Sequence, residues 1–177
     1  MKQVIQIRCK NNKKSQKVEI GSTLFDIFSA FDLKMTHGPV SARVNNKVEG
    51  MHYRVYNSKD VEFLDMTSSS GSRAYTRTLF FVLCKAVQDI YPATDVVIDI
   101  PVSNGFYVDI RLGRPVVDED VNIIRRRMQE IIDARMPIRR FTVPTEEAVA
   151  LFQEKGDVEK VKLLKTSVLS ILMVLYM

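Results

Sequence analysis

The sequence predicts an α+β fold made of two domains. Short runs of β-branched and aromatic residues alternate with segments whose apolar residues recur at helical spacing. The chain of 177 residues is 46% apolar and 27% charged, which is an ordinary globular composition. A flexible polar run at 67–72 divides it. We therefore expect domains at 1–66 and 73–177, joined by a linker at 67–72.

The first domain is expected to have a β-β-α-β-β order. Apolar alternation and turn residues predict strands at 4–7, 18–20, 40–44 and 61–64. Ser22 or Thr23 can cap a helix between the second and third strands. The apolar residues of this helix share one face: Leu24, Ile27, Phe28 and Phe31. This order is typical of a β-grasp (ubiquitin-like) domain.

The second domain is expected to place a long central helix at 75–91 against an antiparallel sheet. That helix is apolar on several faces and ends before Pro92, which is typical of a buried helix. The central hairpin has strands at 96–100 and 106–112 around a Pro, Ser, Asn and Gly turn. Further elements are expected as a helix capped by Asp118, a strand at 138–143, and a helix from 145 that Gly156 ends. The inward residues of the Asp118 helix are expected to be Val121, Ile124, Met128, Ile131 and Ile132.

The segment Pro-Val-Ser-Asn-Gly-Phe-Tyr-Val-Asp at 101–109 resembles the signature of the editing domain of bacterial threonyl-tRNA synthetases. Residues 118–164 resemble the second half of that domain. Residues 1–66 resemble its usual companion, the TGS domain, through 21–27 and 42–45. The resemblance thus implies a TGS domain followed by an editing-like domain, here incomplete, and tRNA or a nucleotide as the ligand.

The same pair of domains also precedes a kinase domain in a group of bacterial uridine or nucleoside kinases, and the departures below make the chain resemble that group more. The seven glycines form no Gly-x-x-x-x-Gly-Lys-Ser/Thr loop to hold phosphates. We therefore expect the chain to be a non-catalytic regulatory region that contains no cofactor. ATP and magnesium would belong to a C-terminal kinase domain outside it. The alternative is a tRNA-binding or aminoacyl-tRNA editing module.

Two departures from the editing family concern its catalytic chemistry. The family's long helix begins with His-x-x-x-His, and the corresponding positions here are Arg77 and Phe81. Phenylalanine offers no donor or acceptor, and arginine stays protonated and repels a cation. We therefore expect no metal site and no catalytic residues in this chain.

The resemblance leaves four residues of the family's pocket, which form the candidate ligand cleft: Asn104, Tyr107, Asp109 and Lys160. Tyr107 and Asp109 alternate on one strand and can share a face. Each has a plainer interpretation, however. Asn104 can be a turn residue, Asp109 can pair with Arg111, and Lys160 can be a solvated helix residue.

The charge of the chain is uneven, with 11 Lys and Arg against 7 Asp and Glu in residues 1–66 and 15 against 14 in the remainder. Lysines gather in the first hairpin, and this patch is the candidate contact for RNA or phosphate: Lys10, Lys13, Lys14 and Lys17. The arginines of 125–140 are interleaved with carboxylates, which favours a mixed solvated face over a phosphate contact.

The remaining features concern location and association. Cys9 and Cys84 fall in different expected domains, and the start of the chain has no signal-peptide pattern, so we expect a cytoplasmic protein with reduced thiols. The apolar run at 168–177 is about half of the roughly 20 residues needed to cross a bilayer. We therefore expect no membrane contact, and self-association is the alternative use of this exposed apolar tail.

Overall fold

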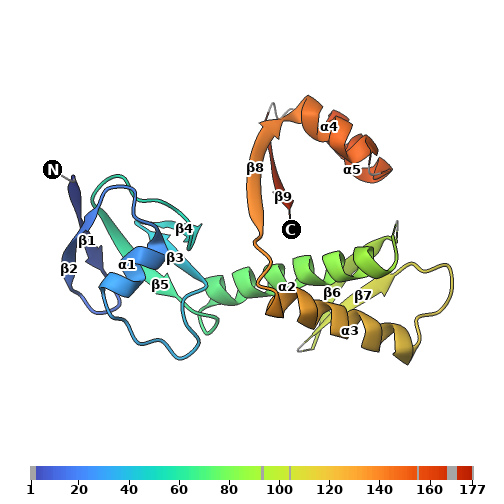
Figure 1. The fold of residues 1–177 in the computed structure, drawn as a ribbon, viewed down its shortest axis with the longest axis horizontal. Helices are drawn as coiled ribbons and strands as arrows, with labels where there is room; N and C mark the ends of the chain where they lie inside the picture. Colours follow the sequence, from blue (N-terminus) through green and yellow to red (C-terminus); the bar gives the residue numbers. More distant parts are fainter. Residues whose placement is uncertain (1–2, 93, 104, 155, 167–170, 177) are drawn as a thin grey trace. The chain divides into compact units, whose positions relative to one another are not determined.

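The computed structural model describes residues 3–92, 94–103, 105–154, 156–166 and 171–176 and has a mixed α+β architecture (Figure 1). Among these residues the strands form one sheet of five strands and two sheets of two strands each. The chain divides into two compact units, Met1–Leu79 and Phe80–Met177. The α+β class is confirmed, whereas the boundaries of the expected domains stay predictions.

The first unit contains the five-stranded mixed sheet, with strand order β2-β1-β5-β3-β4. Its elements are β1 (Val4–Cys9), β2 (Ser15–Glu19), α1 (Leu24–Ala30), β3 (Ser41–Val44), β4 (Lys47–Gly50) and β5 (Lys59–Leu64). Strands β1 and β5 are parallel and the other neighbours are antiparallel. The sequence interpretation missed β4, an edge strand whose single large apolar side chain, Val48, is 42% exposed. The assignment as a TGS domain stays a prediction.

Helix α1 covers the core of the first unit as its apolar spacing predicts. Leu24 and Ile27 are fully buried and pack with Ile7, Val61 and other residues of the sheet. Thr23 is the N-cap: its Oγ1 accepts from the Asp26 N–H at 3.2 Å, and its own N–H donates to Asp26 Oδ2 at 2.8 Å. The Asp26 pKa is lowered by the hydrogen bond from the Thr23 hydroxyl and then by that from the Thr23 backbone.

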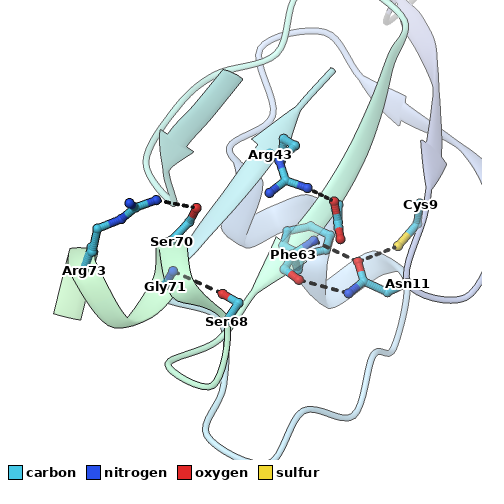
Figure 2. Close-up of polar contacts among 9 residues, drawn as sticks. Cys9, Asn11, Arg43, Phe63, Ser68, Ser70, Gly71 and Arg73 are labelled. Atoms are coloured by element: carbon cyan, nitrogen blue, oxygen red, sulfur yellow. Dashed lines mark hydrogen bonds and ion pairs between the residues drawn. The ribbon is translucent and has the colours of Figure 1, made fainter. Parts of the chain in front are cut away.

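Helix α2 (Ser69–Ile90) begins inside the run that was expected to be a linker. Ser68 Oγ accepts from the Gly71 N–H at 3.1 Å and donates to the Asp65 carbonyl at 2.9 Å, so it acts as a helix cap (Figure 2). A Cβ on Gly71 would lie 1.8 Å from the Asp65 carbonyl oxygen. The Ser and Gly residues that suggested flexibility are therefore a capping residue and a close backbone approach, and the expected helix start at residue 75 is wrong.

The second unit is built on two short sheets and on helices. Its elements after α2 are β6 (Val96–Val102), β7 (Gly105–Ile110), α3 (Asp118–Asp133), β8 (Arg139–Pro144), α4 (Thr145–Glu154), α5 (Val158–Thr166) and β9 (Ile171–Tyr176). One core joins α2 and α3, and its buried residues are Val82, Ala86, Val87, Ile124 and Ile131. Strands β6 and β7 form the expected hairpin.

The apolar face of α3 is narrower than expected. Ile124 and Ile131 are buried and Met128 packs beside them, but Val121 and Ile132 are 43% and 47% exposed. At about 100° per residue, Val121 and Ile132 lie at one edge of the stripe that the other three define. The expectation that these two residues point inward is therefore wrong.

Part of the apolar tail forms strand β9, which pairs antiparallel with β8 from Arg139↔Tyr176 to Pro144↔Ile171. Residues 168–170 and 177 of the expected tail lie outside the described residues. Self-association through the tail stays a prediction. In the part of the chain that is described, no helix combines the length and the apolar character needed to cross a membrane.

Candidate nucleic-acid interface

The β1–β2 hairpin presents the four candidate lysines. Lys10, Lys13 and Lys14 lie in its turn and Lys17 lies on β2, and all four are exposed. The turn closes through a 2.8 Å hydrogen bond from the Cys9 N–H to the Lys14 carbonyl, with Lys13 in the left-handed region at φ 59°. No carboxylate within the described ranges pairs with any of the four. Their charge is therefore available to an anionic partner.

Asn11 joins this turn to the sheet (Figure 2). Its side-chain amide donates to the Phe63 carbonyl at 2.9 Å and accepts from the Phe63 N–H at 2.8 Å. The parallel pairing of β1 with β5 reaches Cys9↔Val61, so the Asn11 amide continues the ladder where the backbone of β1 leaves it. The lysine turn is thereby fixed relative to the sheet.

A hollow of about 650 Å³ opens beside the same turn. It is lined by Asn11, Asn12, Lys14, Phe31, Asp32, Leu33, Lys34, Met35, Thr36 and Asp65. The Asp65 carboxylate accepts from the hydroxyl and N–H of Thr67, and the hydroxyl bond is the first cause of its lowered pKa. Sequence reasoning missed the hollow because its lining comes from three segments that are separate in the chain.

The β6–β7 hairpin contains the second candidate site. Asn104 lies outside the described residues. Tyr107 is 58% exposed, and Asp109 Oδ2 accepts from Arg111 Nε at 3.3 Å, as the plainer interpretation of Asp109 predicts. The Phe106 ring packs edge-on against Phe80 of α2 at 4.8 Å between ring centres. Because side chains alternate along a strand, Tyr107 and Asp109 lie on the face of β7 opposite to Phe106.

Lys160, on α5, is engaged with neighbours in its own segment. Its ammonium group forms an ion pair with Asp157 and lies 5.3 Å from the centre of the Phe152 ring. Hydrogen bonds and ion pairs within the described ranges do not join Lys160 to Tyr107 or Asp109. A cleft shared by these residues therefore stays a prediction.

The two positions that correspond to the family's histidines lie one turn apart on α2. Arg77 is exposed and Phe81 is partly buried. Among the described residues, no group of three or more His, Cys, Asp or Glu is placed to hold a metal ion. Neither the Arg77 side chain nor the Phe81 side chain can serve as a metal ligand, and neither can accept a proton at neutral pH.

A buried carboxylate in the second unit was missed by the sequence interpretation. Asp120 accepts from both terminal nitrogens of Arg114 at 2.6 and 2.7 Å, from the Tyr91 hydroxyl at 2.6 Å and from the Val117 N–H at 3.0 Å. The Arg114 bonds, then the Tyr91 hydroxyl, hold the Asp120 pKa well below its usual range. The N-cap of α3 is Val117, so the expected cap by Asp118 is wrong. Because both oxygens are satisfied, this network is structural: it joins Tyr91, directly after α2, to the loop before α3 and to α3 itself.

Comparison with known proteins favours the synthetase resemblance. The chain is 29% identical over 162 residues to threonine–tRNA ligase from Clostridium kluyveri, covering 92% of this chain and 25% of that protein. The ligases of Acetivibrio thermocellus and Clostridioides difficile are each 28% identical, over 82% and 84% of this chain and 23% of each ligase. The chain thus spans about a quarter of the length of these relatives. No family model matches it.

These relatives give no support to the expected relationship with uridine or nucleoside kinases. Each of the three is a threonine–tRNA ligase by name, and the match to each extends over both units of the chain. The side chains at residues 77 and 81 had favoured the kinase group, but they are compatible with either group. The comparisons therefore favour the alternative, a synthetase-like region.

Proposed function

We propose that this chain is a tRNA-contacting module, with a TGS-like part followed by an editing-like part that binds without hydrolysing. The match to threonine–tRNA ligases over 92% of the chain is the observation that carries this proposal. The contact is made by the lysine hairpin, namely Lys10, Lys13, Lys14 and Lys17. Its four exposed cations suit a phosphate backbone, from which they release counterions.

The binding role is proposed in place of hydrolysis because of the side chains at two positions. Arg77 and Phe81 replace an imidazole pair, and neither residue can activate water or bind a metal. We expect the purified chain to leave mischarged threonine-specific tRNA intact at the rate of the buffer control. Hydrolysis above that rate would contradict the binding role and identify a catalytic group elsewhere.

The lysine contact is tested by filter binding of an unmodified threonine-specific tRNA transcript at increasing salt. Removing one lysine that pairs with a phosphate should reduce the slope of log affinity against log salt by about 0.9. Replacing Lys13 and Lys14 by Gln should therefore weaken binding and flatten the slope by about 2. Lys162→Gln with Lys165→Gln, on exposed positions of α5, is the matched control of equal charge change. Equal weakening in both double variants would show that only net charge matters and would remove the hairpin from the proposal.

The candidate ligand cleft is a second part of the proposal. Tyr107 offers an exposed ring on the outer face of β7, which suits stacking on a base. The double variant Tyr107→Ala with Lys160→Ala should weaken binding of the same tRNA without changing its salt slope by more than about 1. Unchanged affinity would remove these residues from the interface and leave the lysine hairpin as the contact.

A further inference from the structure

The segment 51–56 of the first unit is held along the chain at 21–25, where α1 begins. Four backbone hydrogen bonds hold it: Gly21 N–H to Val55 O (2.9 Å), Val55 N–H to Ser22 O (3.0 Å), Leu24 N–H to Tyr53 O (3.1 Å) and Phe25 N–H to Met51 O (3.2 Å). Thr23 and Arg54 form an antiparallel bridge at the centre. The segment begins with a turn at 51–52, which a 2.9 Å bond from the Tyr53 N–H to the Gly50 carbonyl closes, and it is fixed before any partner arrives.

The side chains of this fixed segment divide between the core and the surface. Met51 and Val55 are buried, at 5% and 1% exposed, and so lie against the core. The other four residues are exposed: His52, Tyr53, Arg54 and Tyr56. We call His52, Arg54 and Tyr56, together with Phe25, the aromatic row.

Each member of the aromatic row faces the chain at 21–25. The His52 ring meets the Phe25 ring edge-on at 5.2 Å between centres. Arg54 Nη1 donates to the Gly21 carbonyl at 2.8 Å, and a Cβ on Gly21 would lie 3.7 Å from Tyr56 Cε1. Along the segment 51–56 the row thus places in succession the His52–Phe25 ring pair, the Arg54 guanidinium group and the Tyr56 ring.

The row remains largely accessible although it contains large apolar groups. Tyr56 is 59% exposed and Phe25 is 43% exposed. Arg54 keeps donors beyond the one that the Gly21 carbonyl accepts. The carboxylate that Arg54 attracts is that of Asp26, which already accepts from the N–H and hydroxyl of Thr23. Aromatic faces stack on unpaired bases while arginine pairs with the phosphates between them.

We propose that the aromatic row is a stacking site for the unpaired bases of an RNA strand, with Arg54 on the intervening phosphate. The choice of RNA rests on the function proposed above and on the cationic excess of residues 1–66, which carry 11 Lys and Arg against 7 Asp and Glu. The stacking geometry itself rests on the row alone.

The test is a titration of the full chain into a single-stranded RNA of about ten nucleotides that contains 2-aminopurine, whose fluorescence reports stacking. We expect the fluorescence to change on binding. His52→Ala with Tyr56→Ala should weaken binding roughly tenfold or more and abolish the fluorescence change, with an unaltered salt slope. Arg54→Gln should instead reduce the salt slope by about 1. Tyr75→Ala is the matched control, because Tyr75 is 41% exposed on α2, outside the row.

The outcomes separate this proposal from the one on which it rests. If Lys13→Gln with Lys14→Gln weakens binding while His52→Ala with Tyr56→Ala does not, the row is excluded and the lysine contact stands. Binding without any aminopurine change, or an equal change with duplex RNA, would also overturn stacking by the row. If the wild-type chain binds neither the tRNA transcript nor the single-stranded RNA, both proposals fail. Far-UV circular dichroism establishes that each variant is folded.

Discussion

Asn11→Ala is the substitution whose effect on stability can be worked out most directly from the structure. The alanine removes both hydrogen bonds that the Asn11 amide forms with the backbone of Phe63, which is 2% exposed. A hydrogen bond contributes about 1 kcal/mol net, so the two together contribute about 2 kcal/mol. The larger cost of leaving the Phe63 N–H and carbonyl without partners is not expected, because Asn11 is exposed and water can take the place of its amide. For a unit of this size, about 2 kcal/mol lowers the melting temperature by roughly 8–16 °C.

The assay is thermal and urea unfolding of the wild type, Asn11→Ala and Asn12→Ala. Asn12 is the matched control, since among the described residues its side chain accepts a single exposed hydrogen bond, from the Lys14 N–H at 3.0 Å. Its replacement should change the unfolding free energy by about 0.5 kcal/mol or less. If Asn11→Ala also stays within about 0.5 kcal/mol of the wild type, the idea that this amide continues the sheet is refuted. If the reasoning holds, Asn11→Ala should also weaken tRNA binding although no lysine is changed.

Three further substitutions test separate contacts. Asp120→Asn should reduce the loss of stability that the wild type shows in acid. In the wild type the Asp120 carboxylate stays ionised in the folded state but takes a proton near pH 4 in the unfolded state. The unfolding free energy of the wild type therefore falls as the pH falls below about 4. Urea unfolding across roughly pH 3–7 measures this, and parallel curves for both proteins would count against it. Gly71→Ala should destabilise by about 1–3 kcal/mol, because its Cβ would overlap the Asp65 carbonyl. Gly50→Ala should not, because a Cβ there meets no described atom within 4 Å beyond its chain neighbours. Equal effects of the two substitutions would disprove the close approach at Gly71. Thr23→Ala should lower the unfolding free energy by about 1 kcal/mol because it removes the α1 cap, and thermal melts showing no decrease would mean that the cap contributes nothing.

The sequence predicts elements where apolar periodicity and local caps agree. The first hairpin, α1 and the β6–β7 hairpin are examples, since alternation, Thr23 and the Pro-to-Gly turn are all local signals. The start of α2 was misplaced because a Ser and Gly run has the composition of a linker. The structure shows why residue 71 is glycine: a Cβ there would clash with the Asp65 carbonyl, and composition alone cannot reveal this contact.

Sites assembled from distant residues could not be predicted in this way. Asp120 is paired with Arg114, six positions before it, and with Tyr91, 29 positions before it, so local pattern gives no sign of its burial. The aromatic row depends on the register between 51–56 and 21–25. The sequence does not show that Met51 and Val55 are buried whereas His52, Arg54 and Tyr56 are exposed. The lysine hairpin was predictable because its charges are adjacent in the chain.

Ion pairing decides which individual cations should contribute to the salt dependence of RNA binding. Five cations of the second unit pair with nearby carboxylates: Lys85 with Asp89, Arg111 with Asp109, Arg114 with Asp120, Arg127 with Asp89 and Glu130, and Lys160 with Asp157. A cation that is already neutralised by a carboxylate has less to gain from a phosphate, because it must give up that partner first. The lysines of the β1–β2 turn have no such partner among the described residues. Arg127→Gln should therefore lower the unfolding free energy with little change in the salt slope of RNA binding. Lys14→Gln should instead reduce the salt slope with little change in the unfolding free energy.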